Sequence, residues 1–129
     1  MPDFNEVLIV DDSSTSRIII QRCIEMAGVS VGSFLFAENG LDAISLIKDN
    51  PRISLVITDI NMPKMDGHTL VRLLKNQTST ASLKVVVVSS IARTDSEEEL
   101  FSLGVTAVIK KPVSPEKIAK ALQAILKDQ

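Results

Sequence analysis

Short runs of β-branched and aliphatic residues alternate with longer segments of helical periodicity along the whole chain. The runs occupy residues 7–10, 31–37, 53–58, 84–88 and 105–109. Four of the five are almost continuously apolar, which is typical of parallel strands buried on both faces. The second run, VGSFLFA, is more polar and suits an edge strand. The alternation predicts an α/β protein with a parallel sheet covered by helices.

Helix start and stop signals lie between the runs. The expected N-caps are Ser13 or Ser14, Asn39, Asp66, Thr94 with Glu97 at capping-box spacing, and Ser114 before Pro115. The expected stops are Gly28, Pro51 and Gly104. The apolar faces are predicted to carry Ile18, Ile19, Cys23, Ile24 and Ala27 in the first helix, then Leu41, Ile44 and Ile47, then Leu70, Leu73 and Leu74, then Leu100, Phe101 and Leu103, and finally Ile118, Ala121, Leu122 and Ile125.

The order of elements restricts the topology. Strand–helix–strand connections between parallel strands are right-handed, so five such units form an open, doubly wound (βα)5 sheet with helices on both faces. A chain of 129 residues has the length of one domain, and no linker or repeat divides it. Ligands of such sheets bind beyond the carboxyl ends of the strands, which makes those ends the place to look for chemistry.

Acidic side chains stand where two of the apolar runs end. Asp11 and Asp12 follow the first run, and Asp59 follows the third. The carboxyl ends of parallel strands meet at one edge, so we expect the three carboxylates to lie together. They would repel one another unless a hard divalent cation with oxygen ligands neutralised them. Mg²⁺ suits such a site, and its habit of binding carboxylates together with phosphate oxygens indicates a phosphoryl ligand.

A hydroxyl and an ammonium group are predicted at the same edge. The fourth run ends in Ser89-Ser90, and the fifth ends in Lys110-Lys111-Pro112. Any one polar residue at a strand end is most often structural. Four strands that deliver acids, a hydroxyl and an ammonium to one edge favour a functional site instead.

Four segments of the chain resemble the receiver domains of two-component response regulators, most closely the free-standing CheY-like type. They are VLIVDDSSTSR, VITDINMPKMDG, VVVVSS and VIKKP, in the family's order and at similar separations. The resemblance implies a flavodoxin-like (βα)5 sandwich whose five-stranded parallel sheet has the order 2-1-3-4-5. It also implies one receiver domain over residues 1–129 without an effector domain.

The resemblance assigns roles residue by residue. Asp59 becomes the phosphoacceptor. Asp12 and Asp59 become Mg²⁺ ligands together with the main-chain carbonyl of Asn61, and Asp11 acts on the metal through water. The implied function is that of a stand-alone response regulator that takes a phosphoryl group from a phosphohistidine donor and signals through a changed surface, in chemotaxis or a phosphorelay. Such a protein is no enzyme apart from its own phosphorylation and autodephosphorylation.

The hydroxyl and lysine positions of the family fall on Ser89 and Lys111, and the resemblance implies a cis bond between Lys111 and Pro112. The chain departs from the family at two positions that concern output. Val108 stands where many relatives carry a switching Tyr or Phe, and Val113 stands where Phe is common. The phosphorylation chemistry is unaffected, but the family's usual route of signal transmission is placed in doubt.

Composition narrows the choice of partners. A net charge of −2, with four Phe and neither Trp nor Tyr, argues against direct nucleic-acid binding. The longest apolar runs are four residues, and the first residues lack the features of a secretory signal, so we expect a cytoplasmic protein without a membrane span. One cysteine, Cys23, and one histidine, His68, cannot build a cysteine-rich zinc site. The expected partners are a histidine kinase or histidine phosphotransfer protein and an unidentified target, with the chain itself a monomer.

Three other interpretations fit less well. A phosphatase of the haloacid dehalogenase type would use Asp11 as nucleophile, but the motif of that family has a second Asp two residues later, where this chain has Ser13. An interaction module that has the receiver fold but is not phosphorylated would lack some of the site residues. This chain keeps all five: Asp11, Asp12, Asp59, Ser89 and Lys111. A nucleotide-binding fold would need a glycine-rich first turn, whereas this chain reads DDSSTS.

Overall fold

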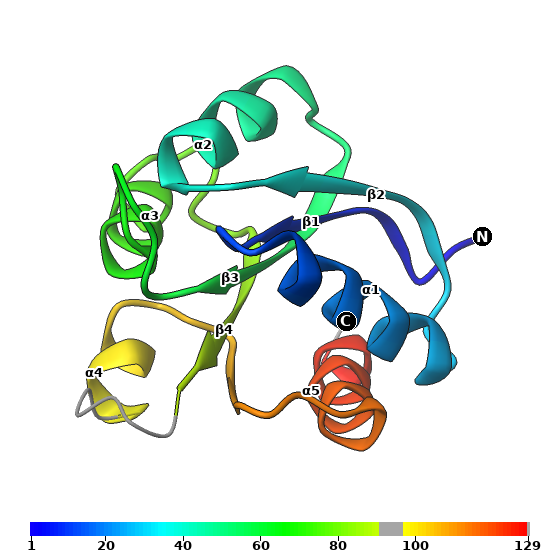
Figure 1. The fold of residues 1–129 in the computed structure, drawn as a ribbon. Helices are drawn as coiled ribbons and strands as arrows, with labels where there is room; N and C mark the ends of the chain where they lie inside the picture. Colours follow the sequence, from blue (N-terminus) through cyan, green and yellow to red (C-terminus); the bar gives the residue numbers. More distant parts are fainter. Residues whose placement is uncertain (91–96, 129) are drawn as a thin grey trace.

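The computed structural model describes residues 1–90 and 97–128. Within them, five strands and five helices alternate strictly along the chain: β1 (Phe4–Val10), α1 (Ser14–Met26), β2 (Val31–Ala37), α2 (Gly40–Asp49), β3 (Ile53–Asp59), α3 (Gly67–Lys75), β4 (Lys84–Ser89), α4 (Glu97–Ser102), β5 (Ala107–Lys110) and α5 (Pro115–Lys127). All strand pairs are parallel, and the sheet has the order β2-β1-β3-β4-β5 (Figure 1). The doubly wound fold and the strand order implied by the resemblance are confirmed.

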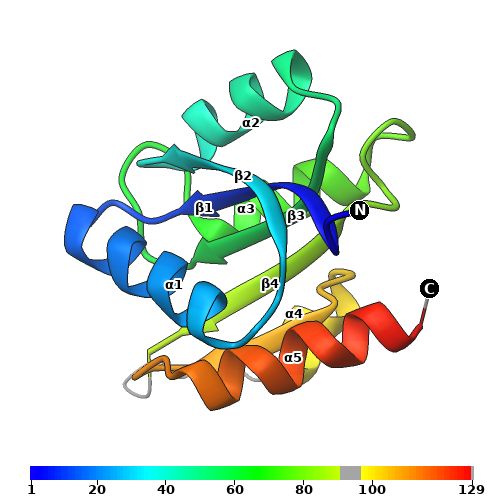
Figure 2. The same cartoon turned by 90° about the vertical axis from the view of Figure 1, so that its right-hand side faces the viewer.

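The sheet separates two apolar cores. On one face, side chains of α1 and α5 pack against alternate residues of β1, β3 and β4. On the other face, α2, α3 and α4 pack against the intervening residues. Figures 1 and 2 show the sheet between these two helical layers. The strands in the middle of the sheet are therefore covered on both sides, which explains why their sequences are continuously apolar.

Helix boundaries follow the predicted caps. The side chains of four N-cap residues accept a hydrogen bond from the backbone N–H three residues later: Ser13, Asn39, Asp66 and Ser114. Gly28 and Gly104 follow α1 and α4 with φ of 79° and 100°, the left-handed conformation that favours glycine. The predicted cap at Thr94 lies outside the described residues. The Ser13 cap thus determines where α1 begins after β1.

The predicted buried face of α1 is partly wrong. Ile18 and Ile19 are 51% and 45% exposed. The buried side chains of this helix are Ile20, Cys23 and Ile24. Three isoleucines stand in succession, each turned about 100° from the last, so only one of them can face the sheet. Leu41 and Phe101, also predicted on apolar faces, are 48% and 46% exposed.

The last strand begins two residues later than predicted. β5 starts at Ala107, whereas the apolar run begins at residue 105. The N–H of Val105 donates to the carbonyl of Leu100 and so closes the end of α4, at an N···O distance of 3.4 Å. The N–H of Thr106 then reaches the carbonyl of Val85 at 2.8 Å and leads the chain into the sheet. The apolar character of Val105 reflects burial beneath α4 instead of strand pairing.

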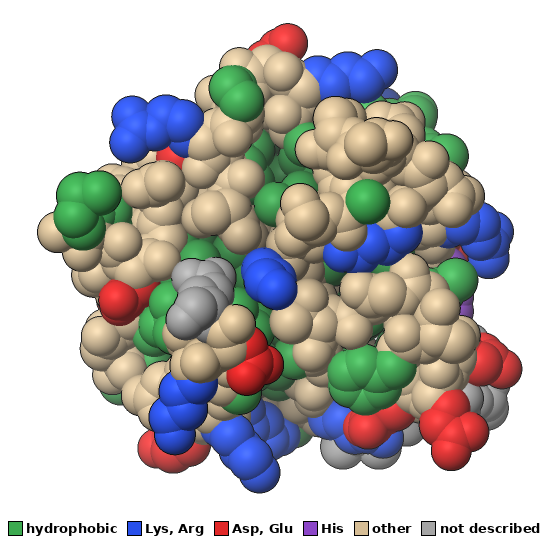
Figure 3. Space-filling view, turned by 180° about the vertical axis from the view of Figure 1, so that it is seen from behind, with side chains coloured by type: hydrophobic (Ala, Val, Ile, Leu, Met, Phe, Trp, Pro, Cys, Tyr) green, Lys and Arg blue, Asp and Glu red, His purple; other side chains and the backbone are tan. Residues whose placement is uncertain are grey.

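The surface carries both signs of charge. On the face shown in Figure 3, acidic and basic side chains are interspersed. Among the described residues, none of the helices is both long and apolar enough to pass through a bilayer.

Candidate functional site

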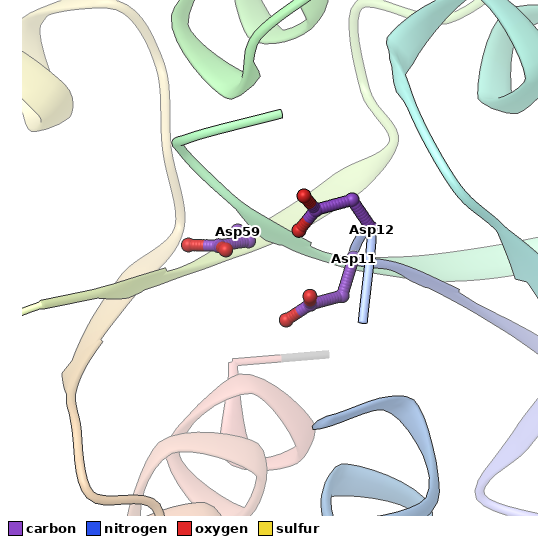
Figure 4. A group of neighbouring side chains, drawn as sticks. All are labelled: Asp11, Asp12 and Asp59. Atoms are coloured by element: carbon purple, nitrogen blue, oxygen red, sulfur yellow. The ribbon is translucent and has the colours of Figure 1, made fainter. Parts of the chain in front are cut away.

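The three acidic side chains predicted to meet do meet, at the carboxyl ends of the neighbouring strands β1 and β3. Asp11 and Asp12 follow β1, and Asp59 is the last residue of β3. One carboxylate oxygen from each lies within 4.8 Å of the others (Figure 4). β1 and β3 are neighbours in the sheet, while α1 and α2 pack on opposite faces, so the cluster lies where the winding of the sheet reverses.

The two neighbouring aspartates differ sharply in burial. Asp11 is 1% exposed, whereas Asp12 is exposed. The Oδ1 atom of Asp11 accepts a hydrogen bond from the backbone N–H of Ser13 at 2.9 Å. Its Oδ2 atom is buried and has no hydrogen-bond partner among the described residues. Burial is the main cause that raises the pKa of Asp11; the charges of Asp59 and Asp12 raise it further, while the Ser13 N–H and Lys111 oppose the shift.

Asp59 is held on three sides. Its Oδ1 atom accepts the backbone N–H of Ile60 at 2.8 Å, and its main-chain carbonyl accepts the hydroxyl of Thr58 at 2.8 Å. Its Oδ2 atom faces the Nζ atom of Lys111 at 3.4 Å. The Lys111 side chain is 35% exposed and that of Asp59 10%, so this ion pair lies at the solvent boundary of the site. Asp59 therefore presents a carboxylate of fixed orientation.

Ser89 and Lys111 arrive from the next two strands. Ser89 is the last residue of β4, directly after Val88, which pairs with Asp59 in the sheet. The Ser89 side chain is buried, and its hydroxyl donates to the carbonyl of Ser90 at 3.4 Å. The N–H of Lys111 donates to the Ser89 carbonyl at 2.8 Å. The two residues are thus tied to each other through the main chain.

The segment after β5 is fixed by α5. In the first turn of that helix, Lys117 donates from Nζ to the carbonyls of Lys110 at 3.1 Å and Pro112 at 2.9 Å. These carbonyls lie on either side of Lys111. The Lys111–Pro112 bond is cis, as the resemblance implies. The Lys110 side chain is exposed, whereas that of Lys111 is partly buried.

The loop between β3 and α3 carries Asn61, which is exposed two residues beyond Asp59. The Gly67 N–H closes the loop by donating to the Ile60 carbonyl at 2.8 Å, and the Gly40 N–H donates to the Met65 carbonyl at 3.0 Å. A Cβ atom at Gly67 would collide with the main-chain carbonyl oxygen of Asp59. Gly67 is therefore required for close approach of α3 to the acidic cluster. The role of the Asn61 carbonyl stays a prediction.

A hollow of about 520 Å³ opens beside the cluster. It is bounded by Asp11 and Lys111 on the polar side and by the following residues elsewhere: Ser16, Ile19, Ile20, Val88, Ser90, Pro112 and Val113. Ile19, exposed against expectation, is one of its walls. Among the three acids, Asp11 lines this hollow, which opens on the side of α1 and the β5–α5 loop.

The donor set suits a hard cation. All three converging side chains offer oxygen, and the Oδ2 atom of Asp11 is buried within the cluster with no protein donor among the described residues. A carboxylate oxygen in that situation is costly unless a cation or a proton satisfies it. Several oxygens within a few ångströms and one open side match the preferences of Mg²⁺.

Two residues near the site were not assigned a role from the sequence. Thr58 supports the Asp59 carbonyl, as described above. The Nη1 atom of Arg17 donates to the main-chain carbonyl of Asp11 at 2.6 Å. The sequence signal for a role of Arg17 was its position one turn into the helix that follows Asp11 and Asp12. His68, in the first turn of α3, is half-buried.

Comparison with known sequences identifies one family. The model of the response regulator receiver domain matches residues 7–123. A chemotaxis protein CheY homolog of Campylobacter jejuni is 31% identical over 121 residues, which are 94% of this chain and 92% of that protein. The sensor histidine kinase CheAY of Helicobacter pylori is 34% identical over 123 residues; the match covers 94% of this chain but only 15% of that protein.

Solved structures give the same fold. The chemotaxis response regulator CheY4 of Vibrio cholerae superposes with a TM-score of 0.77 at 27% identity, over 95% of this chain and 98% of that one. A response regulator receiver domain protein of Clostridium thermocellum gives 0.82 at 25% identity, over 97% and 96%. The acidic cluster, the strand order and the family match agree: the chain belongs to the response regulator receiver domain family and is of the CheY-like type.

Proposed function

We propose that this chain is a stand-alone response regulator that accepts a phosphoryl group on Asp59. The observation that carries the proposal is the arrangement around that carboxylate. Three acids lie within 4.8 Å of one another, and the ammonium of Lys111 stands 3.4 Å from Asp59 Oδ2. Acids gathered for structure alone would need basic partners or separation, whereas a site for a cation and a phosphoryl group explains both the cluster and the lysine.

The reaction needs little from the protein beyond position and charge. A carboxylate oxygen of Asp59 attacks the phosphorus of a phosphohistidine in line; an O–P bond forms, the N–P bond breaks, and its electron pair stays on the histidine nitrogen. No general base is required for a carboxylate nucleophile. Lys111 offsets charge on the equatorial phosphoryl oxygens, and the Ser89 hydroxyl is proposed to donate to one of them.

The metal would be held by Asp12, Asp59 and the main-chain carbonyl of Asn61, with Asp11 acting through a water. When bound, Mg²⁺ supplies positive charge against the phosphoryl oxygens. The same acids make the apo site unfavourable, which supports a role for the cation in the folded state as well as in the reaction.

The donor is proposed to be a histidine kinase or a histidine phosphotransfer protein, which would dock over the hollow beside Lys111, the ion-pair partner of Asp59. Its walls, Ile19, Ile20 and Val113, are apolar and would exclude water from the transfer.

The chemotaxis proteins among the relatives support a role in chemotaxis, and a phosphorelay is the other use of such a module. The output is a changed surface around α4 read by a protein partner, although the half-buried Val108 supplies no aromatic switch. We place the protein in the cytoplasm as a monomer, without nucleic-acid binding and with autodephosphorylation as its only turnover.

A phosphotransfer assay tests the proposal. Wild type, Asp59→Asn and the control Asp49→Asn, an exposed acid at the end of α2, are incubated with a phosphorylated histidine kinase or with acetyl phosphate, with and without Mg²⁺. Wild type and Asp49→Asn should acquire a hydroxylamine-labile label that requires Mg²⁺. Asp59→Asn should acquire none. Equal labelling of Asp59→Asn and wild type would refute the assignment.

A further inference from the structure

We propose that Arg17 is a positioning residue that holds the turn between Asp11 and Asp12 in the geometry needed to bind Mg²⁺. The inference rests on the proposed function of the acidic site and adds to it a residue that does not touch the metal or the phosphoryl group. The structural basis is a hydrogen bond from α1 to the main chain of the acidic pair.

Arg17 lies in the second turn of α1 and is half-buried. Its Nη1 atom donates to the carbonyl of Asp11 at 2.6 Å. Hydrogen bonds from a charged donor are shorter than neutral ones and about twice as strong. Asp11 stands one residue beyond β1, so its carbonyl has left the strand ladder, and Arg17 supplies its bond from the side of the helix.

Asp11 is anchored at three points that leave one oxygen for a ligand. Its N–H donates to the carbonyl of Ala37 at 3.0 Å, its carbonyl accepts from Arg17, and its Oδ1 accepts from the N–H of Ser13. The remaining Oδ2 atom is buried, without a hydrogen-bond partner among the described residues. The main-chain anchors determine where this oxygen points.

The same hydrogen bond orients Asp12. A peptide group is planar, so the carbonyl of Asp11 and the N–H of Asp12 turn together. Fixing the carbonyl with Arg17 therefore fixes the direction in which the exposed Asp12 side chain leaves the main chain. Without that bond the peptide can rotate, and the two carboxylates no longer arrive in one arrangement.

The effect of Arg17 is exerted on the main chain. Its hydrogen bond goes to the carbonyl of Asp11, while Oδ1 of that residue accepts from Ser13 and Oδ2 has no hydrogen-bond partner among the described residues. A positive charge alone is therefore a poor replacement for Arg17. Lysine keeps the charge but presents a compact ammonium in place of the planar guanidinium.

Mg²⁺ affinity is the measurement that separates this role from a merely structural one. Arg17→Met, Arg17→Lys and the control Arg22→Met, an exposed arginine on the same helix, are titrated with MgCl₂ by calorimetry. Loss of a residue that orients metal ligands costs about 10-fold to 100-fold in affinity. Arg17→Met should raise the Mg²⁺ Kd by at least about tenfold, Arg17→Lys by less, and Arg22→Met not at all. Phosphorylation by acetyl phosphate should shift to higher Mg²⁺ in the same order and reach the wild-type rate at saturation.

An unchanged Mg²⁺ Kd in Arg17→Met with a wild-type circular dichroism spectrum overturns the inference. If Arg17→Met does not fold, Arg17→Lys carries the test, and an unchanged Kd there overturns it equally. A lowered melting temperature with an unchanged Kd would identify Arg17 as a structural residue only. If wild type itself binds no Mg²⁺, the proposed function fails together with the inference, so the two failures are distinguishable.

Discussion

Replacing Asp11 with Asn should stabilise the metal-free protein at neutral pH and remove most of its response to Mg²⁺. Asp11 is 1% exposed, and its Oδ2 atom has no hydrogen-bond partner among the described residues. Asparagine has almost the same shape, and its Oδ1 atom can still accept the Ser13 N–H. Its amide can donate to the neighbouring carboxylates, so a repulsive contact becomes an attractive one.

The expected size follows from the cost of an unsatisfied buried polar group, about 1–3 kcal/mol. We take about 1–2 kcal/mol, because Lys111 already offsets part of the charge. An unfolding entropy of about 2.1 cal/mol/K per residue amounts to about 0.27 kcal/mol/K for 129 residues, so each kcal/mol moves the Tm by about 4 °C. Asp11→Asn should therefore melt about 4–8 °C above wild type in EDTA.

Magnesium should narrow the difference in Tm between the two proteins. At ten times its Kd, a ligand of the native state contributes about 1.4 kcal/mol, which raises the wild-type Tm by about 5 °C. Asp11→Asn has lost a negative charge that would act on the metal through a water, and it should gain much less at the same concentration.

The pH dependence gives a second check with a definite sign. Burial raises the pKa of Asp11 in the native state above its ordinary value of 3.8, so the native state keeps this proton to higher pH than the unfolded state does. Its contribution to wild-type stability therefore falls as the pH rises from that value through the raised pKa, and then stays constant. The advantage of Asp11→Asn should be small in acid, grow across that window and level off above it.

Circular dichroism melts in EDTA and in MgCl₂, from about pH 4 to about pH 8, measure both effects. Asp49→Asn, which removes an exposed acid of the same charge, serves as control and should follow wild type. A metal-free Asp11→Asn protein that is less stable than wild type at neutral pH, or that keeps the full Mg²⁺ shift, would contradict the view that Asp11 is an unsatisfied carboxylate awaiting a cation.

Two other substitutions test the packing that positions the site. Ile20→Ala should cost about 2–4 kcal/mol in urea unfolding, because Ile20 is buried, whereas the nearby exposed Ile18→Ala should stay within about 0.5 kcal/mol; similar losses for both would contradict the observed face of α1. Gly67→Ala should destabilise by about 1–3 kcal/mol and slow labelling of Asp59, because the new methyl group meets a main-chain carbonyl that cannot move aside. A Gly67→Ala protein with normal stability and labelling would show that the β3–α3 loop adapts.

The architecture could be predicted because each element has a strong local signal. Continuous runs such as VVVV identify buried strands, and Ser13, Asn39, Asp66 and Ser114 mark helix starts by capping chemistry. Parallel strands align their carboxyl ends, so the three acids of the cluster could be placed together from the strand pattern alone. The ends of β3, β4 and β5 each lie one residue beyond the predicted ends. The larger differences are at strand starts: β1 begins earlier than predicted, and at β5 a buried loop residue extends the apolar run.

What could not be predicted depends on side-chain direction. Ile18, Ile19 and Ile20 are identical in sequence terms, and only the docking of α1 on the sheet decides which one is buried. The unequal burial of Asp11 and Asp12 likewise follows from the path of the turn. The role of Arg17 depends on how far a long side chain reaches across that turn, which spacing alone does not report.

The chain of contacts from Ser89 through Lys111 to Lys117 links the rim of the sheet to the last helix. The Ser89 carbonyl accepts a hydrogen bond from the Lys111 amide, and Lys117 donates to the carbonyls on both sides of Lys111. A displacement of Ser89, Lys111 or Lys117 would therefore move the other two residues. Occupancy of the acidic pocket would then be felt at the amino-terminal turn of α5 without a rotating aromatic ring. In a protein that has Val108 in place of an aromatic residue, these hydrogen bonds would be another route by which a change of charge at the acidic site alters the surface at α5.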